Sequence, residues 1–331
     1  MKRTLKSLLS NQEIFALINV ANIRSSLLST NAVTSPKEFF KFTDKANGIP
    51  ILIPANKKLF YFGQNDFFHL SKKQILKSIY GLSDEKYVGF THAFKQLSFL
   101  NNFEIKDIYK PYVDSFVKQN LNTIAQISSL KDKFKRVGAF QTRNIPHFGH
   151  EKIIQRMLDS CDHVVINPVI GPKKKGDVKL ESLSDVFSFL TKSKYGAKIS
   201  FQPIFANMFY AGPREAMHHA LMRQRIGFQH FTVGRDHAGA DHAYGPRMAP
   251  QYISQNRQQL KIDVMLHEGA ACCHKCNDVI LVGDCDQSSE DINDISGSDF
   301  RSSILARRIF KFADEKMQAY LLKNNMEIFE V

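Results

Sequence analysis

The stretch VGAFQTRNIPHFGHEKII (137–154) contains an apolar run, a polar cluster and an amphipathic run in immediate succession. VGAF (137–140) is typical of a buried strand, and EKIIQRMLDSC (151–161) carries apolar residues at helical spacing. Between them lie an arginine, an asparagine and two histidines that are three residues apart. The stretch therefore predicts a strand that leads into a helix, with polar side chains gathered in the turn.

The same alternation continues after this stretch. The pattern predicts strands at HVVINPVI (163–170), KISFQPIFAN (198–207) and HFTVG (230–234), and helices at LSDVFSFLTKSKYG (183–196) and GPREAMHHALMRQRIG (212–227). Strands that alternate with helices indicate an α/β fold, a doubly wound parallel sheet with helices on both faces. Ligands of such sheets lie beyond the carboxyl ends of the strands, which is where the polar cluster is placed.

The chain is long enough for more than one domain, with 331 residues of which 43% are hydrophobic. GIPILIPANKKLFYFG (48–63) mixes short apolar runs with Gly, Pro and Asn, which predicts β-rich structure with turns. The sequence changes from polar to strand-like across SLKDKFKRVGAF (129–140), which marks a candidate domain boundary. We predict a β-rich N-terminal domain over 1–130, an α/β domain over 131–294 and a small C-terminal helical segment over 295–331.

Charge and cysteine content narrow the class of protein. The net charge of +13 and the sequence pI near 9.4 favour an anionic partner, such as nucleic acid, a membrane surface or a nucleotide. The sequence has no signal-peptide pattern and no apolar run long enough to span a membrane. Five cysteines, four of them within 272–285, do not suit a disulfide framework. We expect a cytoplasmic protein without a membrane partner.

The turn after the first predicted strand has the composition of an anion site. His147 and His150 share one face of the first helical turn, where the helix N-terminus contributes N–H groups and the positive end of its dipole. Gly149 would let a phosphate approach the backbone. The alternative is an ordinary helix cap, but the number of donors in this turn favours the anion site. The further donors are Gln141, Arg143 and Asn144.

A second polar loop, within FTVGRDHAGADHAYG (231–245), follows the strand that ends at Val233. By the strand-end rule it opens onto the same crevice, where Arg235 would stabilise charge that develops during phosphoryl-type transfer. The alternative is a polar loop with an Arg–Asp pair.

In FYAGPREAMHHALMRQRIG (209–227) we assign the histidine pair to packing or to support of the crevice. KKKGD (173–177) is either a solvated charge run or a rim that guides anions.

The cysteine-rich stretch CCHKCNDVILVGDC (272–285) is a candidate structural zinc site. Cys273 and Cys276 have the C-x2-C spacing of a zinc knuckle, and Cys285 follows after eight residues. The alternative is a group of buried, reduced cysteines. A tetrahedral site needs a fourth ligand, which the sequence leaves open. The residues near enough are Cys272, His274, Asp286 and Ser289, of which serine is a poor ligand.

Four motifs in order resemble the ATP sulfurylases (sulfate adenylyltransferases), which belong to the HxGH nucleotidyltransferases. They are QTRN-x-PH-x-GHE (141–151), YAGPREA-x-x-HA (210–220), GRDHAG (234–239) and ISG-x-x-x-R (295–301). The resemblance implies a Rossmann-like nucleotidyltransferase domain for the α/β part and a PUA-like, shortened N-terminal domain. It covers about 130–331 well and the N-terminal part only loosely.

The family resemblance implies a reversible reaction in which ATP and sulfate give adenylyl sulfate and pyrophosphate. A sulfate oxygen would attack the α-phosphorus in line, with Mg²⁺ bound to the nucleotide. Sulfate is a weak nucleophile that is already ionised, so catalysis requires positioning of two repelling anions rather than a general base. The resemblance also implies a role in sulfur metabolism, either in sulfate assimilation or, in the reverse direction, in the formation of ATP by sulfur oxidisers, and it allows a homo-oligomer.

The resemblance implies a role for each residue of the two loops. Gln141, Arg143 and the backbone N–H of Ala238 would hold sulfate. Thr142, Arg143 and Asn144 would form the catalytic stretch, with Gln141 and Asn144 also facing the nucleotide. The phosphates and the leaving pyrophosphate would be held by His147 and His150. The other nucleotide-site residues would be Gly234, Arg235, Asp236 and His237, with Arg235 stabilising the transition state.

The sequence departs from the family pattern at two positions. Phe148 stands where many members have arginine, and Ser289 stands where some members have the histidine that completes a zinc site. The first alternative function is another HxGH nucleotidyltransferase with a different anionic acceptor. The second is an RNA-binding protein that uses the basic charge. Because the sequence has no recognisable RNA motif, we do not expect nucleic acid as a partner.

Overall fold

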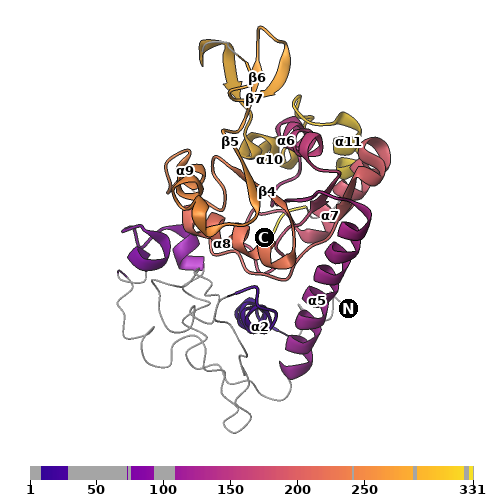
Figure 1. Ribbon diagram of the computed structural model, residues 1–331. Helices are drawn as coiled ribbons and strands as arrows, with labels where there is room; N and C mark the ends of the chain where they lie inside the picture. The colour runs from indigo at the N-terminus through magenta and orange to yellow at the C-terminus, as the bar shows by residue number, and fades with distance from the viewer. Residues whose placement is uncertain are drawn as a thin grey trace.

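The structure is a computed structural model that describes residues 9–28, 73, 76–92, 109–240, 242–285, 289–323 and 328–330 (Figure 1). The predicted β-rich stretch 48–63 lies outside these residues, so the N-terminal β-rich domain stays a prediction. Among the described residues, none of the helices is both long and apolar enough to cross a membrane.

A five-stranded parallel sheet forms the centre of the molecule. Its strands are β1 (Val137–Phe140), β2 (His163–Ile166), β3 (Ile199–Phe201), β4 (His230–Gly234) and β5 (Asp263–His267), in the order β3-β2-β1-β4-β5. Every pair of neighbouring strands is parallel. This confirms the predicted α/β fold and places the reversal of strand order between β1 and β4.

Helices cover both faces of this sheet. They are α6 (Phe148–Ser160), α7 (Leu180–Leu190), α8 (Pro213–Ile226) and α9 (Met248–Gln255). On one face, residues of α8 and α9 pack against Val137, Ala139 and Phe231. On the other face, residues of α6 and α7 pack against Phe140, Val164 and Ile166. Since successive strand residues point to opposite faces, the continuous apolar runs of the strands supply both cores.

The ends of the central helices follow local sequence signals. Pro213 occupies the first turn of α8, where its missing N–H has no cost. Gly227 ends the same helix at φ +105°, a left-handed conformation that glycine adopts without strain. Shorter helical turns are η3 (Leu76–Tyr80), η5 (Thr191–Tyr195), η6 (Gly196–Lys198), η7 (Arg257–Gln259) and η8 (Ser289–Asp291).

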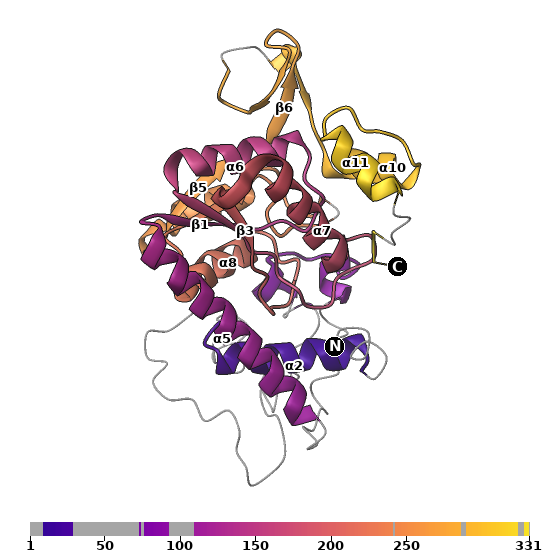
Figure 2. The same ribbon diagram turned by 90° about the vertical axis from the view of Figure 1, so that its right-hand side faces the viewer.

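Two long helices from the N-terminal part lie side by side on the α8 face of the sheet. They are α2 (Asn11–Arg24) and α5 (Lys110–Lys133), and Figure 2 shows α5 crossing α2. Asn120 Nδ2 donates to Asn22 Oδ1 at 3.1 Å and joins the two helices. The α5 helix runs through the predicted boundary at 130, so that boundary falls inside a helix.

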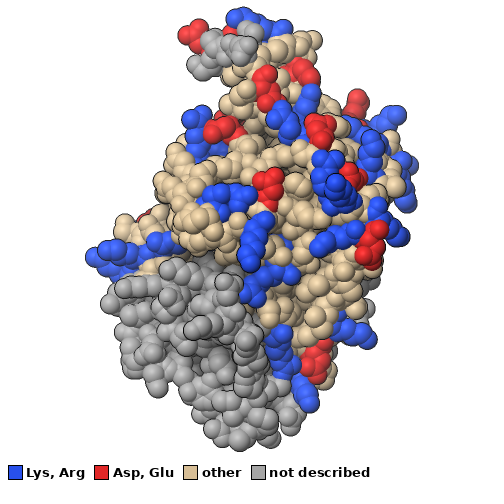
Figure 3. All heavy atoms as spheres, viewed as in Figure 1, with Lys and Arg blue, Asp and Glu red and all other residues tan. Residues whose placement is uncertain are grey.

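The C-terminal part carries a second, smaller sheet. Its strands β6 (Ala270–Cys273), β7 (Asp278–Leu281) and β8 (Ile292–Asp294) are antiparallel, in the order β7-β6-β8. It projects from the edge of the molecule near α6 (Figure 1). Helices α10 (Gly297–Leu305) and α11 (Glu315–Lys323) follow it. On the face in Figure 3, Lys and Arg side chains are interspersed with Asp and Glu.

A tyrosine from the N-terminal part ties this region to the loops above the sheet. The hydroxyl of Tyr87 donates to the carbonyl of Tyr210 at 2.5 Å and accepts the N–H of Ala240 at 3.2 Å. The ring is buried and makes edge contacts with Tyr80 and Tyr244. One side chain therefore joins two loops that are thirty residues apart in the sequence.

We expect the Tyr87→Phe substitution to lower the free energy of unfolding by about 1–3 kcal/mol, because it leaves a buried N–H and a buried carbonyl without a partner. Chemical denaturation with fluorescence or circular dichroism measures this change. Tyr320→Phe is the control, since Tyr320 is 37% exposed, and its effect should stay within about 0.5 kcal/mol. Equal stability of both variants would contradict the linking role of Tyr87.

Candidate functional site

A cavity of about 260 Å³ lies beyond the carboxyl ends of β1 and β4, where the strand order reverses. One wall comes from the loop after β1 and the start of α6, and the opposite wall comes from the loop after β4. The structure brings together every residue predicted for the nucleotide and sulfate sites. They are Gln141, Thr142, Arg143, Asn144, His147, His150, Gly234, Arg235, Asp236, His237 and Ala238.

A larger hollow of about 440 Å³ lies beside α5 and the edge strand β3. Its described lining consists of neutral side chains and Lys133. It is also remote from the point where the strand order reverses. The chemistry of an anion site is therefore concentrated in the smaller cavity.

The two histidines of the first wall form a reciprocal cap on α6. The N–H of Gly149 donates to His147 Nδ1 at 3.1 Å, and the N–H of His147 donates to His150 Nδ1 at 3.4 Å. A neutral imidazole carries one proton, so a ring whose Nδ1 accepts a hydrogen bond carries that proton on Nε2. The cap therefore fixes both rings with Nε2–H as the remaining donor.

Both imidazoles are neutral at physiological pH. Burial lowers the pKa of His147 to about 4. Burial also lowers the pKa of His150 well below its ordinary value, with further lowering from His147 and His267. The ring centroids of His147 and His150 are 4.0 Å apart, a separation at which two positive charges would repel strongly. The pair offers neutral N–H donors to an anion.

The start of α6 differs from the sequence-based expectation. The N–H of Phe148 donates to the carbonyl of Phe312 at 2.7 Å, and the N–H of Gly149 is used by His147. A Cβ on Gly149 would lie 2.6 Å from the Cβ of Ala270, so packing against Ala270 requires this glycine. The Phe148 ring packs against the core on the α6 face. Imidazole donors therefore take the place that we assigned to the backbone N–H groups of the helix N-terminus.

Arg143 extends from the first wall towards the second. Its Nη2 donates to the carbonyl of Gly239 at 2.5 Å, and its guanidinium lies 5.3 Å from the centre of the Tyr210 ring. Its Nη1 lies 3.8 Å from the buried carboxylate of Asp177 and has no hydrogen-bond partner within the described structure. Burial alone would lower the pKa of Arg143, but Asp177 and neighbouring groups raise it, so the guanidinium stays charged.

Lys173, Lys174 and Asp177 of the basic run 173–177 turn inward, whereas Lys175 is exposed, so the run is neither simply a solvated charge run nor simply a rim. Lys173 Nζ donates to the carbonyl of Val178 at 2.9 Å, and burial lowers the pKa of Lys173. Lys174 Nζ lies 3.8 Å from Asp177, which also accepts a hydrogen bond from the Tyr210 hydroxyl at 2.8 Å. The run therefore holds the aspartate that faces Arg143.

Arg235 on the second wall is held by two carboxylates. Its Nη1 donates to Asp294 of β8 at 3.0 Å, and its Nε donates to Asp236 at 3.4 Å. Burial would lower the pKa of Arg235, and these two carboxylates raise it. The Arg235 side chain is 28% exposed and that of Asp294 is 60% exposed, so water and an incoming anion both reach this pair.

Two residues of the opposite walls meet the same buried histidine of α8. Gln141 Nε2 lies 3.2 Å and His237 Nε2 lies 3.1 Å from His219 Nδ1. Burial lowers the pKa of His237 and of His219 well below the ordinary value. Ala238, the next residue on the second wall, has a φ of +57°, a left-handed conformation that is uncommon for a residue other than glycine.

Sequence reasoning assigned no role to several residues at this cavity. Arg301 Nη2 lies 3.5 Å from Asn144 Oδ1, and the ISG-x-x-x-R motif was the signal that pointed to it. His267 and Gly269 line the cavity from the end of β5, an edge strand whose five residues are partly exposed. Such a short, mixed strand gives little periodic signal, so this part of the wall was missed.

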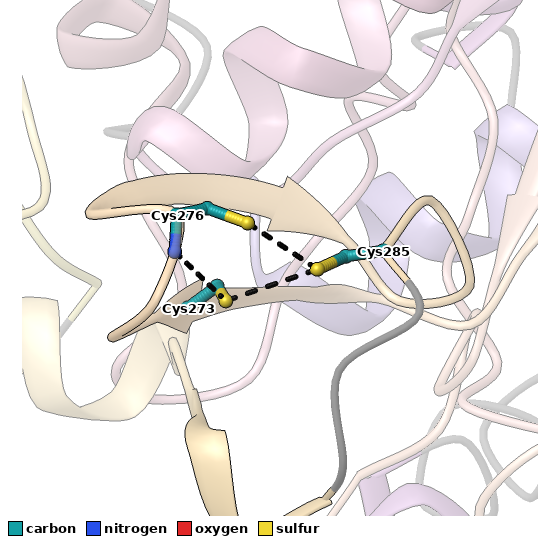
Figure 4. A group of neighbouring side chains, drawn as sticks. All are labelled: Cys273, Cys276 and Cys285. Atoms are coloured by element: carbon teal, nitrogen blue, oxygen red, sulfur yellow. Dashed lines mark hydrogen bonds between the residues drawn. The ribbon is translucent and has the colours of Figure 1, made fainter.

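The three cysteines of the predicted zinc site lie together on the smaller sheet, away from the cavity. Figure 4 shows their sulfur atoms directed towards one another. Sγ of Cys285 lies 3.3 Å from that of Cys276 and 3.9 Å from that of Cys273. Thiolates around a tetrahedral zinc ion are about 3.8 Å apart, given zinc–sulfur bonds of about 2.3 Å. The three positions therefore fit such an ion.

Of the proposed fourth ligands, the two that can be judged do not complete the cluster. His274 Nε2 lies 2.6 Å from Asn293 Nδ2, and Cys272 neighbours Cys273 on a strand, where successive side chains point to opposite faces. Asp286 lies outside the described residues, and the side chain of Ser289 is not among those described. The cluster found within the described residues has three members, Cys273, Cys276 and Cys285.

Comparisons with a family profile and with curated proteins point to one family. A family profile described as ATP-sulfurylase matches residues 119–308, more than half of the chain. The sulfate adenylyltransferase of Pyrococcus abyssi is 32% identical over 268 residues, which cover 80% of this chain and 68% of that protein. That of Thermococcus onnurineus is 29% identical over an alignment that covers 100% of this chain and 93% of that protein.

Among solved structures, one titled "Hexameric APS kinase from Thiobacillus denitrificans" overlays on 61% of this chain and 39% of that chain. The TM-score is 0.48 and the identity 13%, too low to bear on fold or function.

The buried histidines make the stability of the protein sensitive to acid. Between pH 6.5 and about 4, His147 is protonated in the unfolded chain but not in the folded protein, so the free energy of unfolding decreases as the pH falls through this window. We expect His147→Asn, which keeps a good capping side chain, to reduce that dependence by up to about 1.4 kcal/mol per pH unit. Denaturant titrations from pH 7 to 4 measure it, and identical slopes in both proteins would contradict the assignment.

Proposed function

The chain belongs to the ATP-sulfurylase family, and from this premise we propose that it transfers the adenylyl group of ATP to sulfate, giving adenylyl sulfate and pyrophosphate. One observation carries the proposal. The QTRN and HFGH residues of one wall and the GRDHA residues of the other line a single cavity at the reversal of strand order. Its donors are Arg, His and amide groups, and Asp236 is the one carboxylate among its described lining residues.

Such a cavity suits a reaction between two anions. Sulfate is fully ionised at neutral pH, so its attack on the α-phosphorus needs no general base. The requirement is to hold sulfate and the triphosphate in line and to offset their repulsion. Mg²⁺ enters with ATP as part of the substrate, because a cavity with one carboxylate is suited to a magnesium–nucleotide complex rather than to a resident cation.

In this proposal Arg143 binds sulfate. Its Nη1 has no hydrogen-bond partner among the described residues, while Nη2 is held by Gly239. A guanidinium that a carbonyl holds at Nη2 and that has a carboxylate near Nη1 is oriented before sulfate arrives, which lowers the entropic cost of binding. Gln141 and the backbone of Ala238 line the same cavity.

His147 and His150 bind the phosphates of the leaving pyrophosphate in this proposal. Their Nδ1 atoms are used by the helix cap, so their Nε2–H groups are the donors. Because both rings are neutral, they hold the phosphates by hydrogen bonds and release pyrophosphate more easily than two cations would. Thr142 and Asn144 flank Arg143 in the sequence, next to the reacting centre of this proposal.

In this proposal Arg235 leaves its carboxylate partners and stabilises the charge that develops in the transition state. In the structure it is paired with Asp294 and Asp236, and the Asp294 carboxylate is well exposed. Exposed ion pairs of this kind contribute roughly 0–1 kcal/mol, so charge that develops on the α-phosphoryl group competes for the guanidinium. Asp236, His237 and Gly234 line the same wall, and in this proposal they face the nucleotide.

For the smaller sheet we propose a structural zinc ion bound by Cys273, Cys276 and Cys285. The N–H of Cys276 donates to Cys273 Sγ at 3.4 Å, and the pKa of the Cys273 thiol is lowered by this backbone N–H, which favours the thiolate that a metal binds. When bound, zinc would cross-link the turn after β6 to the loop after β7.

The domain limits and location remain proposals. We keep an N-terminal β-rich, PUA-like domain over 1–130, a catalytic domain over 131–294 and a C-terminal helical segment over 295–331. A cytoplasmic location is supported by the free thiols of all five cysteines.

The purified protein should release pyrophosphate from ATP only when sulfate, or molybdate as a surrogate, is present. Arg143→Lys keeps the positive charge but loses the planar set of N–H donors of the guanidinium, so we expect kcat/KM to fall roughly 10²- to 10³-fold. Arg136→Lys is the matched control, because Arg136 lies in an exposed ion pair with Asp162. Pyrophosphate release without sulfate or molybdate would reject sulfate as the acceptor. Release that requires a different anion, and that sulfate does not support, would reject it as well.

Protein purified without chelators should contain about one zinc per chain by elemental analysis. Cys276→Ser should remove most of the metal and lower the melting temperature, whereas Cys272→Ser, outside the cluster, should retain it. A chelator should destabilise the wild type but not Cys276→Ser. A zinc content near zero in the wild type would overturn the proposed site.

A further inference from the structure

A buried chain of polar side chains lies directly behind the cavity and touches both of its walls. It begins at Glu215 in the first turn of α8 and passes to His219 one turn later. His219 Nε2 lies 3.3 Å from Glu215 Oε1, and its Nδ1 lies 3.2 Å from Gln141 and 3.1 Å from His237. Glu215 and His219 are completely buried, whereas Gln141 and His237 face the cavity.

The backbone contacts of Glu215 favour its ionised form. Its Oε1 accepts the N–H of Phe209 at 2.9 Å, and its Oε2 accepts the N–H of Ala211 at 2.9 Å. A proton on either oxygen would have to share that oxygen with a backbone N–H donor. Burial raises the pKa of Glu215 to about 7, and these backbone N–H groups act against that increase. Above pH 7 the group is therefore ionised.

The carboxylate in turn decides where His219 carries its proton. Burial lowers the pKa of His219 well below its ordinary value, so the ring is neutral and has one N–H. Nε2 makes no hydrogen bond within the described structure, but a lone pair on it would lie 3.3 Å from a carboxylate oxygen, which is electrostatically unfavourable. The proton therefore lies on Nε2, and Nδ1 is an acceptor.

We propose that His219 is a positioning residue whose Nδ1 lone pair fixes the orientation of the Gln141 amide and the tautomer of His237. This inference rests on the proposed function, because the role of Gln141 in sulfate binding belongs to it. An acceptor on Nδ1 requires an N–H from each partner, so Gln141 turns its Nε2 and not its Oε1 towards His219. His237 must carry its proton on Nε2.

The orientation of the Gln141 amide matters because its two ends have opposite effects on an oxyanion. With Nε2 held at His219, the second amide hydrogen stays on the same nitrogen and is available to an anion; Met208 Sδ, 3.9 Å away, is a weak competitor. Without the acceptor the amide is free to turn by 180° and to present its oxygen to sulfate. The wall would then repel the substrate that it has to bind.

A purely structural role for His219 predicts a different pattern. Glu215 and His219 are four residues apart on one face of α8, and such pairs stabilise helices without any role in catalysis. If only this contact mattered, a side chain that reaches Glu215 would be the better replacement. If the acceptor at Nδ1 matters, a side chain that restores an acceptor at that position would be better.

Two substitutions separate these roles. In His219→Asn the Oδ1 atom takes the position of Nδ1 but the side chain falls short of Glu215. In His219→Gln the amide reaches the position of Nε2 near Glu215, while a methylene group replaces the acceptor. KM and kcat for sulfate and for ATP are measured at pH 8, where Glu215 is ionised, together with the melting temperature of each variant.

We expect His219→Gln to lower kcat/KM for sulfate by about 10- to 100-fold, the loss of one hydrogen bond to a charged group, with KM for ATP changed less than threefold. His219→Asn should recover most of the sulfate kcat/KM despite a lower melting temperature. The proposal is overturned if His219→Gln is the more active variant, or if activity merely follows melting temperature in both.

A second measurement keeps this test separate from that of the proposed function. In the wild type with ¹⁵N-labelled histidine, His219 Nδ1 should resonate as an unprotonated nitrogen and His237 Nε2 as a protonated one, with assignment from the spectrum of His219→Asn. If the wild type shows these tautomers but no sulfate-dependent pyrophosphate release, the proposed function fails and the positioning stands. A protonated His219 Nδ1 overturns the positioning whatever the activity.

Discussion

The parallel pairing of β1 with β4 is the constraint on which the site depends. Gly138 pairs with His230 and Ala139 with Phe231, although about ninety residues separate the two strands. Because both strands run in the same direction and neighbour each other where the strand order reverses, the loops that follow them open towards one point. The QTRN and GRDHA loops can therefore form opposite walls of one cavity.

The positive charges at that cavity are compensated by neighbouring groups. Arg143 is compensated by Asp177 and a carbonyl, and Arg235 is compensated by Asp294. His147 and His150 are neutral because they are buried. Such an arrangement lets the folded protein bring cationic and imidazole groups together without strong mutual repulsion, and in the proposed function a bound anion would gain from each exchange of partner.

How far the sequence could predict the structure depended on the strength of the local signals. The strands and helices between 137 and 234 were predicted correctly because apolar β-branched runs alternate there with helical periodicity. β5 was missed because it is a short, partly exposed edge strand, and β6–β8 were missed because only the cysteine spacing of that region was considered. The run 173–177 could not be read correctly, since Lys173 and Lys174 contact Val178 and Asp177, and Asp177 is held by the hydroxyl of Tyr210, which is distant in sequence.

The sequence by itself determined the residue types of the site, the parallel α/β class and the three clustered thiols, because each depends on local spacing. Only the tertiary structure decided how those residues act. Capping contacts set the tautomers of His147 and His150, and contacts between α8 and both walls give His219 its place behind Gln141. The capping contacts are local but form only once the helix is folded, and the contacts of His219 join residues that are distant in sequence, so a linear pattern records neither.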